Sequence, residues 1–141
     1  MYWKGMSMKP SLQFSVPCLD ATMEGNNLSF NRVFFDLPSH ELYPPEFYTF
    51  PTPAFDKFYI ANGWSMGQGH FNVKMRILDP NGETLEGSTF ERDFTLENKY
   101  TPFLTLFRLE NIVFPMLGQY KVQIFLDNQL HLEYYIELRK I

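Results

Sequence analysis

Apolar and polar residues alternate with a period of two along most of this chain, which predicts β-strands with one face in a core. The clearest run lies at 71–79, where Phe71, Val73, Met75 and Ile77 form the apolar set and Asn72, Lys74 and Arg76 the polar set. The same period predicts further strands at 12–18, 28–37, 54–64, 84–96, 118–126 and 130–138.

Two of these segments carry irregularities that predict local structure, and a further segment, 102–114, fits two patterns. Pro17 interrupts the first strand, so we expect it at a sheet edge or a bulge, because proline donates no ladder hydrogen bond. The apolar phase slips within 28–37, which predicts a β-bulge near Asn31 and Arg32. The segment 102–114 is so densely apolar that helix and strand patterns both fit. A strand is favoured there, with a helical turn at 109–112 as the alternative.

Turn residues separate the strands. Asp79-Pro80-Asn81-Gly82 predicts a tight turn with Asp79 as its capping residue, and Asp127-Asn128 predicts the hairpin between the last two strands. Gly118 suits the unusual backbone angles of a strand start, and the Tyr120 hydroxyl is expected to reach back to the main chain. The inward set of the last two strands is predicted to be Tyr120, Val122, Ile124, Leu126, Leu130, Leu132, Tyr134, Ile136 and Leu138.

Seven to eight short strands and no convincing helix predict an all-β, antiparallel sandwich, with a jelly roll or a small closed barrel as alternatives. The aromatic composition agrees, because 15 Phe, 8 Tyr and 2 Trp fit a pleated surface better than a helix. The length of 141 residues fits one domain, expected at 11–141 behind a flexible leader at 1–10.

Charge and cysteine content exclude several classes of protein. The formal net charge is −4 and the basic residues are scattered, which argues against nucleic acid and anionic membrane surfaces as partners. There is no apolar run of membrane-spanning length, and a single cysteine cannot form an internal disulfide. We therefore expect a soluble cytoplasmic protein.

Several of these motifs together resemble a family of small bacterial domains of unknown function with an immunoglobulin-like β-sandwich. The matching features are Cys18–Asp20, then Trp64 with the Gly67, Gly69 and His70 region, the 79–82 turn, and the closing pattern from Phe114 to Asn128. The chain departs from that pattern at Met116-Leu117 and by having Asn128 in place of glycine. The resemblance implies an immunoglobulin-like fold and a bacterial origin, and it implies no activity.

No residue pattern predicts a reaction site, a metal site or a cofactor. His40, His70 and His131 are far apart in sequence, whereas a metal site needs three or four converging donors. Asp20, Asp36, Asp56 and Asp79 lack the spacing of a calcium loop. Cys18 lies on the apolar parity of its strand, as expected of a buried, inert thiol.

The segment 38–53 holds half of the chain's ten prolines, interleaved with four aromatic residues: Tyr43, Phe47, Tyr48 and Phe50. These aromatics either cover an open edge of the core, bind a protein, or line a small-ligand groove. Tyr and Phe supply contact area at low entropic cost, so we expect an interaction surface here, joined by Trp64 and the 65–70 connection.

The function predicted from the sequence is that of a non-catalytic module that contacts other proteins or copies of itself. A carbohydrate-binding module is the alternative, because many β-sandwiches stack exposed aromatic rings on sugars. An enzyme is the second alternative, although no acid, base or nucleophile constellation supports it.

Overall fold

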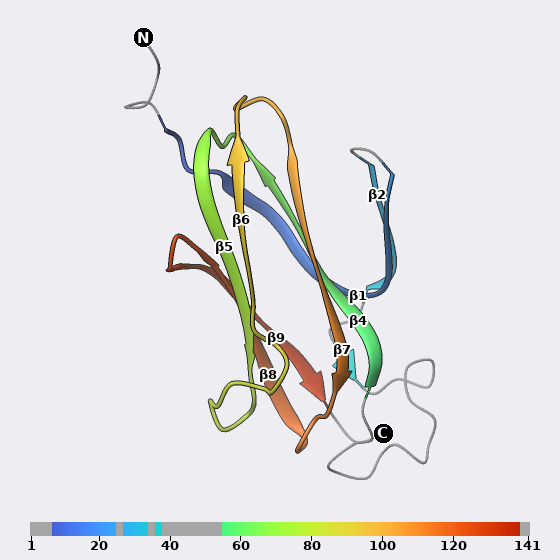
Figure 1. Cartoon of the computed structure of the whole chain (residues 1–141). Coiled ribbons are helices and arrows are strands. Elements are labelled where there is room, and N and C mark those ends of the chain that lie inside the picture. Colours follow the sequence, from blue (N-terminus) through green and yellow to red (C-terminus); the bar gives the residue numbers. More distant parts are fainter. Residues whose placement is uncertain (1–6, 25–26, 34–35, 38–54, 139–141) are drawn as a thin grey trace.

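The computed structural model describes residues 7–24, 27–33, 36–37 and 55–138, which form two β-sheets packed face to face (Figure 1). The described part of the chain contains strands and no helix. The strands are β1 (Ser11–Glu24), β2 (Asn27–Val33), β3 (Asp36–Leu37), β4 (Phe55–Ser65), β5 (Gly69–Leu78), β6 (Phe90–Leu96), β7 (Phe103–Ile112), β8 (Gly118–Leu126) and β9 (Gln129–Leu138). The predicted all-β class is confirmed, and the helical turn at 109–112 is wrong because β7 continues through it.

The strand order confirms an immunoglobulin-like sandwich. One sheet runs β2-β1-β4-β7 and the other β3-β9-β8-β5-β6, and all pairs are antiparallel except β3 with β9. The orders β1-β4-β7 and β9-β8-β5-β6 correspond to strands A-B-E and G-F-C-C′ of that fold. Since the two sheets remain separate, the closed-barrel alternative is wrong.

The core lies between the inner faces of the two sheets. The predicted inward set of β5, Phe71, Val73, Met75 and Ile77, is buried, which confirms the clearest alternation in the sequence. Two aromatic pairs close one side of the sandwich by joining β6 to β7. The rings of Phe94 and Phe103 stack at 4.1 Å and 15°, and those of Phe90 and Phe107 lie 5.9 Å apart.

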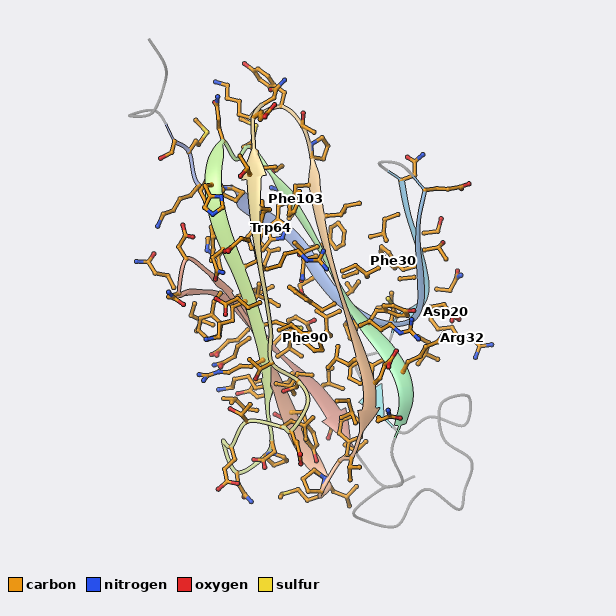
Figure 2. All side chains as sticks on the ribbon, viewed as in Figure 1. Asp20, Phe30, Arg32, Trp64, Phe90 and Phe103 are labelled. Atoms are coloured by element: carbon orange, nitrogen blue, oxygen red, sulfur yellow. The ribbon has the colours of Figure 1, made fainter. Side chains whose placement is uncertain are left out.

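Strand β1 changes partner halfway along its length. Its first part pairs with β4 up to Cys18, and its second part pairs with β2 from Cys18 onward. Pro17 lies in the first part, where β1 has a partner on one side, so its predicted edge position is confirmed. Strand β2 and the second half of β1 form one end of the four-stranded sheet (Figure 1). The ring of Phe30 on β2 (Figure 2) lies 6.0 Å from that of Phe14.

The bulge predicted near Asn31 and Arg32 is wrong. The pairing of β1 with β2 keeps one register from Cys18 opposite Val33 to Asp20 opposite Asn31. The irregularity is taken up instead by the backbone of Arg32, which has a φ of 59°, and Val33 is left 43% exposed. The bulge in this sheet lies between Leu12 and Phe14, against β4.

The predicted inward set is buried throughout β8 but only in the second half of β9. Leu130 and Leu132 are 48% and 37% exposed, so their predicted core positions are wrong. The pairing shifts where Ile124 faces Leu132 and Phe125 faces Leu130, which leaves His131 as an extra residue. The extra residue reverses the parity, so Leu130 lies on the outer face with Phe125. Leu132 borders a depression of about 360 Å³ between β1 and β9.

Candidate functional site

The structure corrects one residue of the predicted interaction surface, Trp64. Its side chain is 1% exposed and lies between the two sheets (Figure 2). Strand β4 continues to Ser65, so Trp64 shares the inward parity of Phe58 and Ile60, and its Nε1–H donates to Thr105 Oγ1 at 3.0 Å. The other predicted members, Tyr43, Phe47, Tyr48 and Phe50, lie outside the described residues.

A small polar cluster lies inside the sandwich around Thr105. The Thr105 hydroxyl oxygen also accepts from Asn62 Nδ2 at 3.1 Å, which its two lone pairs allow. Nearby, Ser15 Oγ and Tyr134 Oη share a hydrogen bond of 3.1 Å that joins the two sheets. Burial raises the pKa of Tyr134 far above its ordinary value, so its hydroxyl stays neutral. These groups anchor β4 and β7 to each other, and β1 to β9.

The residues singled out as a structural motif occupy structural positions. The Tyr120 hydroxyl donates to Met116 O at 2.7 Å and accepts from Met116 N at 3.3 Å, the geometry of a tyrosine corner. Burial raises the pKa of Tyr120 to about 12, outweighing the lowering effect of the Met116 hydrogen bond. Gly118 has a φ of 135°, and a side chain there would meet Pro80 at 2.7 Å.

The hairpin between β8 and β9 is built by Asp127 and Asn128. Their φ angles of 48° and 65° are both positive, as a type I′ turn requires. Asp127 Oδ1 also accepts from Asn72 N at 2.9 Å, which ties the turn to β5. In the other predicted turn, Asp79 Oδ1 accepts from the N–H groups of Asn81 and Glu83 at 2.8 and 3.0 Å, so the capping role of Asp79 is confirmed.

Groups with the chemistry for catalysis or metal binding are not brought together in the described part of the chain. Burial, reinforced by the nearby Asp20 carboxylate, raises the pKa of Cys18 to about 11, which keeps the thiol protonated and unreactive. His70 Nδ1 lies 3.0 Å from Thr95 Oγ1 on the surface, whereas the His131 ring lies 5.8 Å from that of Trp64. No three histidine, cysteine or carboxylate side chains among the described residues could hold a metal ion.

A depression of about 720 Å³ lies at the end of the sandwich that holds the 79–83 turn. Its acidic lining includes Asp79, whose carboxylate already holds the turn, and Glu83 and Glu86. The rest of its wall is amide, hydroxyl and apolar surface, with no histidine, cysteine or lysine among the lining residues. The ionisable side chains among its lining residues are therefore carboxylates alone.

The outer face of the five-stranded sheet is a polar surface. Arg76 Nε donates to Gln123 Oε1 at 2.7 Å, and Gln123 Nε2 donates to Glu133 Oε2 at 2.9 Å, which forms a ladder across β5, β8 and β9. Two tyrosines in the described part are more than half exposed, Tyr135 on β9 and Tyr100 between β6 and β7. A lysine lies over one face of each ring, Lys99 over Tyr100 and Lys121 over Tyr135.

Strand β7 is one of the edge strands of the described sheets. Among the described residues its backbone pairs with β4 alone, over ten residues from Phe103 to Ile112. Its outward side chains are Leu104 and Leu106, both half-buried, followed by the exposed ion pair of Arg108 and Glu110. The sequence analysis did not identify this edge, although the signal was present. The apolar density that made 102–114 ambiguous reflects apolar residues on both faces of one strand.

Residues 46–139 match the model of DUF6941, a family of unknown function. A crystal structure of a glycosyl hydrolase family 2 member from Bacteroides cellulosilyticus DSM 14838 is similar, with 22% sequence identity and a TM-score of 0.40. That similarity covers 62% of this chain and 13% of the other chain. No curated protein matches the chain. No helix in the described part is long and apolar enough to cross a membrane.

Proposed function

This chain belongs to the DUF6941 family of unknown function, and from that premise we propose that it is a non-catalytic module that acts through contact with protein. The partner class includes copies of the chain itself. The observation that carries the proposal is the edge of β7, which within the described residues pairs with β4 alone. The other edge of the strand combines backbone hydrogen-bonding groups that no described strand pairs with and the apolar side chains of Leu104 and Leu106. Extended segments of other proteins recognise such edges by adding a strand.

The surroundings of the described ionisable groups support a non-catalytic role. Enzymes usually place groups of perturbed pKa together in a cleft. Here Cys18, Tyr120 and Tyr134 have raised pKa values, but Tyr120 and Tyr134 serve structural hydrogen bonds and Cys18 is buried as a neutral thiol. All three therefore stay uncharged near neutral pH, as expected for groups that stabilise a fold.

We also propose the bacterial cytoplasm as the compartment, with neither nucleic acid nor membrane lipid as partner. The single cysteine is buried and free, which suits a reducing environment. The net charge of −4 disfavours polyanionic partners. The proline-rich segment 38–53 remains a predicted second contact surface. A pull-down that compares the wild type with Phe47→Ala/Tyr48→Ala tests it.

The proposal is tested by photo-crosslinking in cells that produce the protein. A photoreactive amino acid replaces Leu104 on the β7 edge, and in a matched control it replaces Thr95, an exposed residue on the edge strand β6. We expect one or a few discrete protein adducts at position 104 and none above background at position 95. Their identity is then read by mass spectrometry. If position 104 and the segment 38–53 both gave no specific protein adduct, the proposed function would be wrong.

A further inference from the structure

We propose that the partner of β7 is the β7 strand of a second copy. The two strands run antiparallel about a two-fold axis, with Leu106 facing Leu106 of the second copy. The two four-stranded sheets then join into one continuous sheet across the dimer. This inference rests on the proposed function and names its partner.

The backbone of β7 suits strand addition along most of its length. Its pairing with β4 keeps a constant register from Trp64 opposite Phe103 to Phe55 opposite Ile112. The first positive φ in the strand is at Asn111, 55°, near its end. From Phe103 to Glu110 the strand contains no proline, glycine or bulge, which are the features that commonly block an edge. Alternate N–H and C=O groups along this stretch are directed away from β4.

The order of side chains on the outer face makes the strand complementary to itself. In the proposed register Leu106 faces Leu106 of the second copy, and Leu104 faces Arg108 of the second copy. The apolar residues then meet at the axis, while the aliphatic stem of each arginine covers a leucine. Each Glu110 remains beside its own Arg108, with which it already forms an ion pair.

Shifting the axis to Phe107, toward the end of β7, removes this complementarity. An axis at Phe107 places Arg108 opposite Leu106 of the second copy, so the two arginines become diagonal neighbours only about 7–8 Å apart. An axis at Leu106 separates the two Arg108 side chains by about 13 Å along the strands, which reduces their repulsion. An odd shift would pair outward with inward residues and bury Arg108 against the core face. The charge pattern therefore disfavours the register with its axis at Phe107.

Cysteine substitution tests the register directly. Residues directly opposite in antiparallel strands have Cα atoms about 4.5–5.5 Å apart, which a disulfide can span. In Leu106→Cys we expect a covalent dimer under mild oxidation. In the matched control Leu104→Cys the two cysteines lie about 13 Å apart, beyond disulfide reach. The native Cys18 is buried, so it should not contribute to the cross-link.

The expected result is about tenfold more disulfide-linked dimer for Leu106→Cys than for Leu104→Cys or for Thr95→Cys on β6. Light scattering of the wild type should show a dimer that Leu106→Lys converts to a monomer. A wild-type monomer, or equal cross-linking at all three positions, would overturn the inference. If the wild type were a monomer and position 104 captured a different protein in cells, the proposed function would stand without this inference.

Discussion

The sandwich has two strand edges on the same side, β6 and β7, and they are built in opposite ways. The seven-residue β6 carries three consecutive charged residues, Glu91, Arg92 and Asp93. Arg92 has the parity of the buried Phe94 and Leu96 and is nevertheless exposed, so it places a charge at the inner margin of the sheet. Short, charged edge strands with an inward-pointing charge resist pairing with other chains.

Strand β7 lacks each of these protective features over most of its length. It is ten residues long, and its charged residues, Arg108 and Glu110, lie in its second half. Its inner residues Phe103 and Phe107 pack against Phe94 and Phe90 of β6. Core packing therefore does not explain why the outer residues of the two strands differ. The two edges share their inner packing and differ in outer chemistry, and under our proposal β6 is protected from contact and β7 is open to it.

The largest expected effect comes from breaking the contact that holds both edges. Phe107 is 3% exposed and its ring lies 5.9 Å from that of Phe90. We expect Phe107→Ala to lower the free energy of unfolding by about 3–5 kcal/mol, because a large buried side chain leaves a cavity. Urea unfolding measures the change. The neighbouring Leu106→Ala, on the half-buried outer face, should cost much less, and equal costs would contradict the assignment of faces.

The next largest effect is expected at Thr105, because it anchors β7 to β4 through a buried hydroxyl, whereas the Thr95 hydroxyl of β6 contacts His70 at the surface. Thr105→Val keeps the shape of the side chain but removes the acceptor for Trp64 Nε1 and Asn62 Nδ2. Two buried donors would lose their partner, at a cost of about 2–4 kcal/mol in the free energy of unfolding. Thr105→Ser keeps the oxygen and should recover much of that stability. If Val and Ser variants unfolded at the same urea concentration, the hydroxyl would not be the anchor.

Regular alternation made most of the fold predictable from the sequence. Strand β5 follows the period of two without interruption, and both Pro17 and the 79–83 turn have the positions that backbone chemistry predicts. The candidate edge was less accessible. The sequence shows that segment 102–114 is rich in apolar residues. It does not show the strand order, which depends on segments far apart in the chain and which, among the described strands, gives β7 the single partner β4.

The wrong prediction for Leu130 has a physical cause, which is that one extra residue changes the parity of everything beyond it. The extra residue His131 moves Leu130 to the outer face, and the sequence around it contains no glycine or proline that would signal a bulge. Trp64 was assigned to the surface because it precedes a glycine-rich connection. Its burial depends on a hydroxyl 41 positions later, at Thr105, and the sequence alone does not show that these residues meet.

An effect of intermediate size is expected when a lysine is placed on the edge strand β7 and, as a control, on the edge strand β6. Lysine on an exposed edge opposes strand pairing through its charge. We therefore expect Leu106→Lys to weaken dimerisation at least about tenfold, equivalent to about 1.4 kcal/mol. Analytical ultracentrifugation over a concentration series measures this change. Thr95→Lys on β6 is the control and should leave the dimer unchanged. A similar loss in both variants would indicate a general effect of charge rather than a contact at β7.

The smallest effect is expected at Tyr120, which lies on β8 and away from both edges. Tyr120→Phe removes the hydrogen bond to Met116 O, and we expect it to lower the free energy of unfolding by about 0.5–1.5 kcal/mol. Dimerisation measured by ultracentrifugation should not change. A weakened dimer in this variant would show that association responds to overall stability, and the contrast between β6 and β7 would lose its support.

The same substitution has a signature in the pH dependence of stability. The pKa of Tyr120 rises from 10.0 to about 12 in the folded chain, because burial disfavours the phenolate. The stability linked to this shift is fully present below pH 10 and is lost as the pH rises toward 12, since the unfolded chain releases the proton first. Cys18, with a raised pKa of about 11, contributes a loss of the same sign in both proteins. Between pH 9 and 12, the free energy of unfolding measured with urea should therefore fall less steeply for Tyr120→Phe than for the wild type. If it fell equally in both proteins, the Tyr120 hydroxyl would not be buried.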